Sequence, residues 1–208
     1  DEFPEFRKDT LEALRQPIED GFVTITRASA RSTYPAQFML VAAMNPCPCG
    51  NYGSRITPCR CTAQQIQRYR NRISGPMLDR IDIHVEMVEV GYNDIAGRSC
   101  GEPSSAIRAR VNAARAIQTR RYAGMGILFN AQLTNRMMNQ YCVLTSDAEA
   151  LMKKAFAALK LSARAYTRLL KVSRTIADLA GSEQIKAEHI AEAIQYRSLE
   201  SKYWGEIR

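Results

Sequence analysis

The order of apolar and polar residues divides the chain into a mixed first half and a helical second half. Residues 9–16 place Leu11 and Leu14 on one helical face, and Pro17 is expected to kink or end that helix. The following residues are β-prone in two stretches, 22–26 and 32–37. We therefore predict a helix and then a β-hairpin, with the Arg27–Arg31 region at its tip.

Three further segments complete the predicted first half. The continuous apolar run at 38–44 is typical of a strand buried on both faces, which favours a parallel sheet. Residues 63–73 read as a basic helix. Residues 81–90 alternate between apolar and polar side chains and predict a second strand. The first half is thus expected to have an α/β fold.

Beyond a linker that contains Gly97, Gly101 and Pro103, the pattern becomes helical. Helices are predicted from the serines at 104–105, from a capping-box pattern at Ser146, and from Ser162 to a stop at Gly181, followed by a last helix over 185–197. This is the pattern of an all-α bundle. We place the domain boundary near residue 98, which gives domains 1–97 and 98–208.

The composition is that of a soluble protein, with 46% hydrophobic and 24% charged residues. No apolar run approaches the ~20 residues of a membrane span and no signal-peptide pattern is present, so a cytoplasmic location without a membrane partner is expected. The net charge is +8, and residues 51–80 hold six arginines against one acid, Asp79. Either an anionic partner or a solvated basic face accounts for this segment.

Four of the six cysteines have the spacing C-x-C-x9-C-x-C, namely Cys47, Cys49, Cys59 and Cys61. A turn around residues 50–53 can bring the two pairs together, and a tetrahedral Zn²⁺ needs sulfurs about 3.8 Å apart. Such a site is structural, because protein ligands fill all four positions. Four unliganded thiols on a surface loop are the alternative.

Several polar residues stand at the expected ends of elements. Asn45 follows the predicted buried strand, where ligands collect in parallel sheets, or else it caps the turn before Pro46. Arg80 precedes the predicted strand at 81–90 and either projects from it or pairs with a neighbouring aspartate. Arg164 lies in the first turn of a helix, where a cation is unfavourable unless it holds an anion. His84 is interpreted as structural and His189 as a solvated or capping residue, which leaves no nucleophilic triad.

Long motifs carry a resemblance to a known family. The stretches "DEFPEFRKDTLEALRQPIEDGFVTITRAS", "FMLVAAMNPCPCG", "CRCT" and "RISGPMLDRIDIHVE" resemble the bacterial magnesium-chelatase-like AAA+ ATPases, in the subgroup linked to competence and DNA branch migration. The similarity covers nearly the whole chain. It implies the carboxyl-terminal half of a parallel-sheet AAA+ core over 1–97 and a helical lid over 98–208.

The resemblance also implies roles for five residues. Asp1 would hold Mg²⁺, Glu2 would polarise the attacking water, and Asn45 matches the sensor-1 position. Arg80 matches an arginine finger that reaches the ATP of the next subunit, and Arg164 resembles the sensor-2 arginine of the lid. The implied partners are further copies of the chain in a hexameric ring, and DNA.

One part of the family pattern is missing, because the 208 residues contain no G-x-x-x-x-G-K-[ST] phosphate loop. We interpret the chain as part of a longer ATPase and expect it alone to be inactive. The predicted function of the intact protein is ATP-driven remodelling of DNA, with Arg27 and Arg31 of the hairpin on the phosphate backbone. The alternative is a zinc-stabilised basic module that binds nucleic acid or protein without catalysis. Insertion of magnesium into a porphyrin ranks third.

Overall fold

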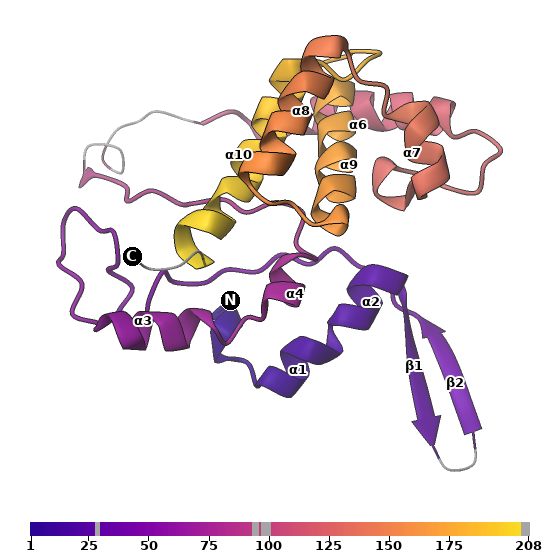
Figure 1. Ribbon diagram of the computed structural model, residues 1–208. Coiled ribbons are helices and arrows are strands. Elements are labelled where there is room, and N and C mark those ends of the chain that lie inside the picture. Colours follow the sequence, from indigo (N-terminus) through magenta and orange to yellow (C-terminus); the bar gives the residue numbers. More distant parts are fainter. Residues whose placement is uncertain (28–29, 93–95, 97–100, 205–208) are drawn as a thin grey trace. The chain divides into compact units, whose positions relative to one another are not determined.

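The computed structural model describes residues 1–27, 30–92, 96 and 101–204. It consists of two compact units (Figure 1): Asp1–Ile81 together with the segment from Leu199, and Asp82–Ser198. The predicted boundary at residue 98 falls outside the described residues, so the division into 1–97 and 98–208 stays a prediction. In the described part of the chain, no helix is both long and apolar enough to cross a membrane.

The first unit begins with a short 3-10 turn, η1 (Phe3–Glu5), and two consecutive helices, α1 (Lys8–Ala13) and α2 (Arg15–Asp20). The prediction that Pro17 kinks or ends this helix is wrong: the break lies at Leu14, and Pro17 sits within the first turn of α2, where its missing N–H costs little. Gly21 ends α2 with φ 73°, a left-handed conformation that glycine adopts without strain.

The hairpin consists of β1 (Phe22–Arg27) and β2 (Ala30–Pro35), which pair antiparallel. It extends away from α2 in Figure 1, and every residue of β2 is exposed. Thr26 faces Arg31 across the ladder and Arg27 faces Ala30. Because successive side chains alternate in direction, Arg27 and Arg31 lie on opposite faces of the ribbon.

The two longer strands predicted for a parallel sheet do not form. Residues 38–44 have no regular secondary structure, and Met39 and Val41 are 86% and 80% exposed. Residues 81–90 are likewise irregular, with Met87 87% exposed. The one sheet among the described residues is the hairpin. A strand needs a neighbour to satisfy its backbone N–H and C=O groups, and no described segment forms a ladder with either run.

Two more helices complete the first unit, α3 (Ala63–Arg70) and α4 (Gly75–Leu78). Thr62 and Gln65 form a full capping box at the start of α3. The small core gathers apolar side chains from the chain start, α1 and α4: Phe3, Leu11, Ile73, Met77 and Leu78. The Ser74 hydroxyl donates to Glu12 at 2.6 Å and joins α1 to the start of α4.

The second unit is helical, as predicted. Its elements are α6 (Ser104–Arg121), η2 (Asn130–Gln132), α7 (Asn135–Tyr141), α8 (Ser146–Ala158), α9 (Ala163–Leu179) and the part of α10 (Ala187–Trp204) up to Ser198. Ser162 caps α9 as expected, accepting from the Ala165 N–H at 3.1 Å. The cap of α8 is Thr145, one residue before the predicted Ser146.

A buried charged network in the second unit escaped the sequence analysis. Asp178 of α9 is 2% exposed and accepts from both terminal nitrogens of Arg121, at 2.9 and 2.5 Å. It also accepts from Asn130 at 2.9 Å and from the Nε of Arg174 at 3.2 Å. Burial alone raises the pKa of Asp178, but these hydrogen bonds and the two positive charges outweigh it, so that pKa is lowered.

Candidate functional site

The four predicted cysteines come together in one cluster in the first unit. Their Sγ atoms all lie within 4.8 Å of one another. The Sγ atom of Cys47 is 3.4 Å from that of Cys49 and 3.7 Å from that of Cys59, and the Cys49–Cys59 separation is 3.6 Å. These distances are far longer than a disulfide bond and match the ~3.8 Å of a tetrahedral zinc–thiolate centre. The arrangement therefore fits one metal ion with four thiolate ligands.

Turns between the two cysteine pairs produce this arrangement. The Gly50 N–H donates to the Cys47 carbonyl at 3.0 Å, and Gly50 and Gly53 have φ of 80° and 85°. Side chains with a Cβ rarely adopt these angles, which explains why glycine stands at both points. The Ser54 hydroxyl then accepts from the Thr57 N–H at 2.9 Å and turns the chain back toward Cys59.

A buried arginine braces the cluster from α3. Arg70 is 3% exposed, donates from Nε to the Pro46 carbonyl at 3.2 Å, and lies over the Tyr52 ring at 4.6 Å. The Arg70 guanidinium thus contacts a residue that precedes Cys47 and a residue that follows Cys49 in the sequence. The sequence analysis missed this role, although a signal existed: Arg70 follows Ile66 by four residues and shares the inward face of α3.

The thiols of the cluster differ in acidity. Backbone hydrogen bonds from Arg60 and Asn51 lower the pKa of Cys49 to about 6. Desolvation, together with hydrogen bonds to neighbouring thiols, raises the pKa of Cys61 to about 12. Protein groups alone thus stabilise charge on part of the cluster, while a cation at its centre would favour the deprotonated form of all four ligands.

A backbone hydrogen bond joins the segment that contains Asp1 and Glu2 to the segment that precedes Asn45. The Phe3 N–H donates to the Ala43 carbonyl at 3.0 Å, so Glu2 and Asn45 lie near this backbone contact. Asp1, Glu2 and Asn45 are all exposed, and the Asp1 carboxylate accepts from the Glu2 N–H at 2.8 Å. Carboxylate and amide oxygens are the ligands that Mg²⁺ prefers, so this set of donors fits that ion.

Arg80 has a different environment from the one expected of a projecting side chain. It is 8% exposed, forms an ion pair with Glu19 of α2, and donates to the Pro76 carbonyl at 2.7 Å. Glu19 is not one of the neighbouring aspartates expected as partners, because it lies 61 residues earlier in the chain.

The remaining predicted residues are exposed. Arg164 lies in the first turn of α9, in the second unit. Arg27 and Arg31 lie near the end of the hairpin.

Both histidines are partly or fully buried. Burial, followed by the charge of Arg197, lowers the pKa of His84 to about 4. His189 is 3% exposed and its Nδ1 accepts from the Lys186 N–H at 3.0 Å.

Comparison with known proteins identifies two matching family models. The model described as magnesium chelatase, subunit ChlI, matches residues 1–95. The model described as magnesium chelatase, subunit ChlI C-terminal, matches residues 101–197.

Individual relatives agree with these matches. The competence protein ComM of Haemophilus influenzae is 46% identical over 200 residues, and YifB of Salmonella typhimurium, an uncharacterized protein, is 44% identical over 201. The uncharacterized protein Rv2897c of Mycobacterium tuberculosis is 34% identical over 197 residues. The alignments cover 95–96% of this chain but only 38–39% of each relative. The chain thus belongs to the magnesium chelatase subunit ChlI family and spans about 38% of the length of these curated relatives.

Proposed function

We propose that the protein which carries this chain is an ATP-hydrolysing AAA+ ring motor that remodels DNA. The family assignment and the similarity to a competence protein support the class. The observation that carries the proposal is the backbone hydrogen bond of 3.0 Å between Phe3 and Ala43, because it joins the two leading acids to the segment that contains Asn45. Asp1, Glu2 and Asn45 are all exposed, so a ligand can reach each of these side chains.

The roles follow from the needs of phosphoryl transfer, which depends mainly on positioning and on neutralising charge. Asp1 would hold Mg²⁺, which would supply positive charge against the phosphates of ATP. Glu2 polarises the attacking water, and Asn45 orients it. A cation from the neighbouring subunit would stabilise the transition state, and the resemblance gives Arg164 a sensor-2 role toward ATP.

The ion pair of Arg80 adds a condition to this proposal. Arg80 is held by Glu19 and by the carbonyl of Pro76 in its own chain. For Arg80 to act on the next subunit's ATP, its guanidinium has to exchange Glu19 for a phosphate. Glu19 then serves as a stand-in anion, which compensates the buried cation while no nucleotide is in reach.

A mixing experiment with the product of the complete gene tests the proposal. ATP hydrolysis is measured with and without DNA for the wild type, Glu2→Gln and Arg80→Ala. Each variant alone should lose most of its activity, since a finger supplied in trans is worth about 10³–10⁵ in rate. A mixture of the two variants should recover activity, because Glu2→Gln subunits supply the intact arginine to neighbours that keep Glu2.

The outcomes separate the parts of the proposal. An Arg80→Ala protein with wild-type turnover excludes the finger role. A mixture no more active than its components excludes action between subunits. A wild-type protein that hydrolyses no ATP, with or without DNA, refutes the motor altogether. Lys153→Ala, an exposed substitution on α8, is the control and should leave turnover unchanged.

A second function, a zinc-stabilised binding module, is favoured by the thiol geometry. Purified under reducing conditions without chelator, the chain should contain about one zinc ion. Cys59→Ser should lose the metal. Cys142→Ser, a matched control at a buried thiol in the second unit, should retain it. Zinc in the Cys59→Ser protein, or none in the wild type, contradicts a closed four-thiolate centre.

A further inference from the structure

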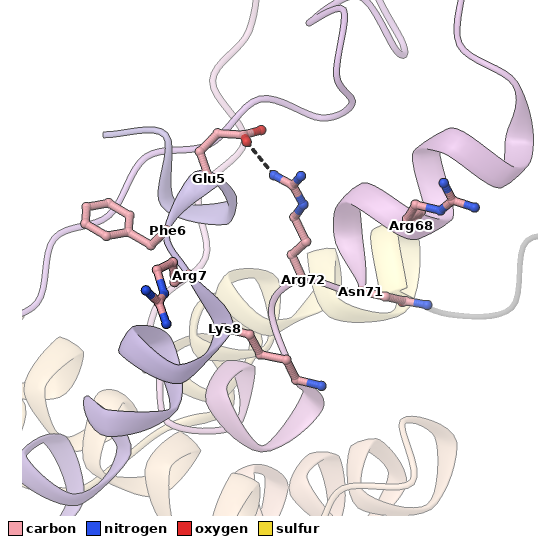
Figure 2. Close-up of a pocket in the computed structure, with 7 residues that line it drawn as sticks. All are labelled: Glu5, Phe6, Arg7, Lys8, Arg68, Asn71 and Arg72. Carbon is pink, nitrogen blue, oxygen red and sulfur yellow. Dashed lines mark hydrogen bonds and ion pairs between the residues drawn. The ribbon is translucent and has the colours of Figure 1, made fainter.

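A pocket of about 410 Å³ lies in the first unit, apart from the cysteine cluster and the acids at the chain start (Figure 2). Residues 5–8 at the start of α1 form one side of it, and the C-terminal end of α3 forms the other. Figure 2 shows Phe6 and Arg7 on one side and Arg68 and Asn71 on the opposite side, with Lys8 and Arg72 between them. Both sides belong to one compact unit.

The lining is strongly basic. Its charged members are four cations, Arg7, Lys8, Arg68 and Arg72, and one acid, Glu5. Glu5 is paired with Arg72, whose guanidinium also donates to the Pro4 carbonyl at 3.2 Å. This pair of interactions orients Arg72 at the centre of the pocket. The cations all remain exposed to solvent, so an anionic ligand can reach them.

Local ion pairing accounts for only part of this charge. Arg7 pairs with Asp9 at 2.7 Å and Arg72 with Glu5. Neither Lys8 nor Arg68 makes an ion pair in the described part of the chain; Lys8 comes from the start of α1 and Arg68 from α3. Lys8 also opens a helix, where the dipole disfavours a cation. Helix stability therefore does not explain its position.

An exposed aromatic ring, Phe6, lines one side of the pocket beside Arg7 (Figure 2). Phe6 is 53% exposed and is absent from the core cluster that holds its neighbour Phe3. A ring next to cationic side chains matches a ligand in which flat bases alternate with phosphates. In a single strand the face of a base can stack on Phe6, whereas in a duplex that face is covered by the next base pair.

From this combination we propose that the pocket binds single-stranded nucleic acid, with Lys8 and Arg68 on the phosphates and Phe6 stacked on a base. The inference deepens the proposed function, since it rests on DNA being the remodelled substrate and names the single strand as the form held here. The pocket residues and the hairpin arginines Arg27 and Arg31 are different residues of the first unit. Each candidate DNA-binding region can therefore be tested by its own substitutions.

The test measures binding of the 208-residue chain to a fluorescein-labelled oligothymidylate of about 15 nucleotides, a length near the upper site size of single-strand binders. Fluorescence anisotropy is recorded over a range of salt concentrations. Phe6→Ala should weaken binding about tenfold, because stacking of one base is worth ~1–3 kcal/mol. Lys8→Ala/Arg68→Ala should reduce the slope of log K against log salt by about 1.4, since each phosphate that is no longer neutralised lowers it by about 0.7.

Matched controls come from the second unit. Phe156→Ala removes a ring of similar exposure, 43%, and Lys153→Ala/Lys154→Ala removes two exposed charges from α8. Both should bind like the wild type. All substituted residues are exposed, and circular dichroism checks that each variant is folded.

Every outcome decides the proposal. Unchanged binding by Phe6→Ala and by the double variant moves the binding site elsewhere and overturns the pocket, while the motor proposal stands. Equal affinity for duplex of the same length, with no effect of Phe6→Ala, shows a generic basic surface and overturns single-strand recognition. Competition by ATP at equal phosphate concentration identifies the ligand as a free nucleotide and likewise overturns it. Absence of binding by the wild type also overturns the inference, whereas failure of the motor shows separately, as a lack of ATP turnover by the complete gene product.

Discussion

Replacing Asp178 by asparagine should cost the second unit much of its stability. The carboxylate is 2% exposed and accepts four hydrogen bonds, from Arg121 twice, from Asn130 and from Arg174. Asparagine keeps the size of the side chain but removes the negative charge and turns one acceptor into a donor that faces other donors. Arg174, 1% exposed, is then left as a buried cation without its counter-ion.

The size of the effect follows from this burial. Removing one partner of a buried ion pair costs ~3–5 kcal/mol, against a total stability of ~5–15 kcal/mol for a typical domain. With a urea dependence of about 1–3 kcal/mol per molar, the unfolding midpoint of the helical unit should fall by about 2 M. Arg174 keeps its hydrogen bonds to the carbonyls of Glu183 and Ser182, at 2.7 and 2.5 Å, so the unit need not unfold outright.

Urea unfolding followed by circular dichroism at 222 nm measures this shift. The control is Asp82→Asn in the same unit, where the carboxylate is 53% exposed and its ion pair with Arg168 is worth at most ~1 kcal/mol. If the two variants unfold at the same urea concentration, burial does not govern the contribution of these charges and the reasoning fails.

Three further predictions concern other parts of the molecule. Arg70→Lys keeps the charge but removes the planar group that lies over the Tyr52 ring. In competition with a chelator, this variant should therefore retain zinc about 10-fold more weakly than the control Arg68→Lys. Equal zinc retention by the two variants would exclude a bracing role for Arg70. His84 has a lowered pKa of about 4, so its contribution to stability is complete above about pH 6.5 and declines as the pH falls toward 4. His84→Leu should therefore flatten the thermal stability profile between these pH values, and an unchanged profile would contradict the assignment. Ser162→Ala removes the cap of α9 and should lower the free energy of unfolding by ~1 kcal/mol. The control is Ser105→Ala, at an exposed serine in the first turn of α6, which should have a smaller effect because no side chain caps that helix. Equal effects of the two substitutions would contradict a capping role for Ser162.

The sequence by itself determined the features that depend on near neighbours. The end of α9 at Gly181 and the cap at Ser162 follow from bonds within one or two turns of the backbone. The hairpin and the gathering of the four thiols followed in the same way, because the turns that produce them lie between the paired residues. Short loops leave the chain few alternatives, and local side-chain chemistry selects among them.

The tertiary structure alone decided which distant groups meet. Apolar runs at 38–44 and 81–90 have the pattern of strands, yet a strand exists only where another segment supplies hydrogen bonds, and periodicity carries no information about that partner. The same holds for Glu19 beside Arg80 and for Arg121 beside Asp178, each pair separated by more than fifty residues. Ionic partners at such distances are chosen by how helices pack. The residue types are therefore visible in the sequence, whereas their pairing is a property of the fold.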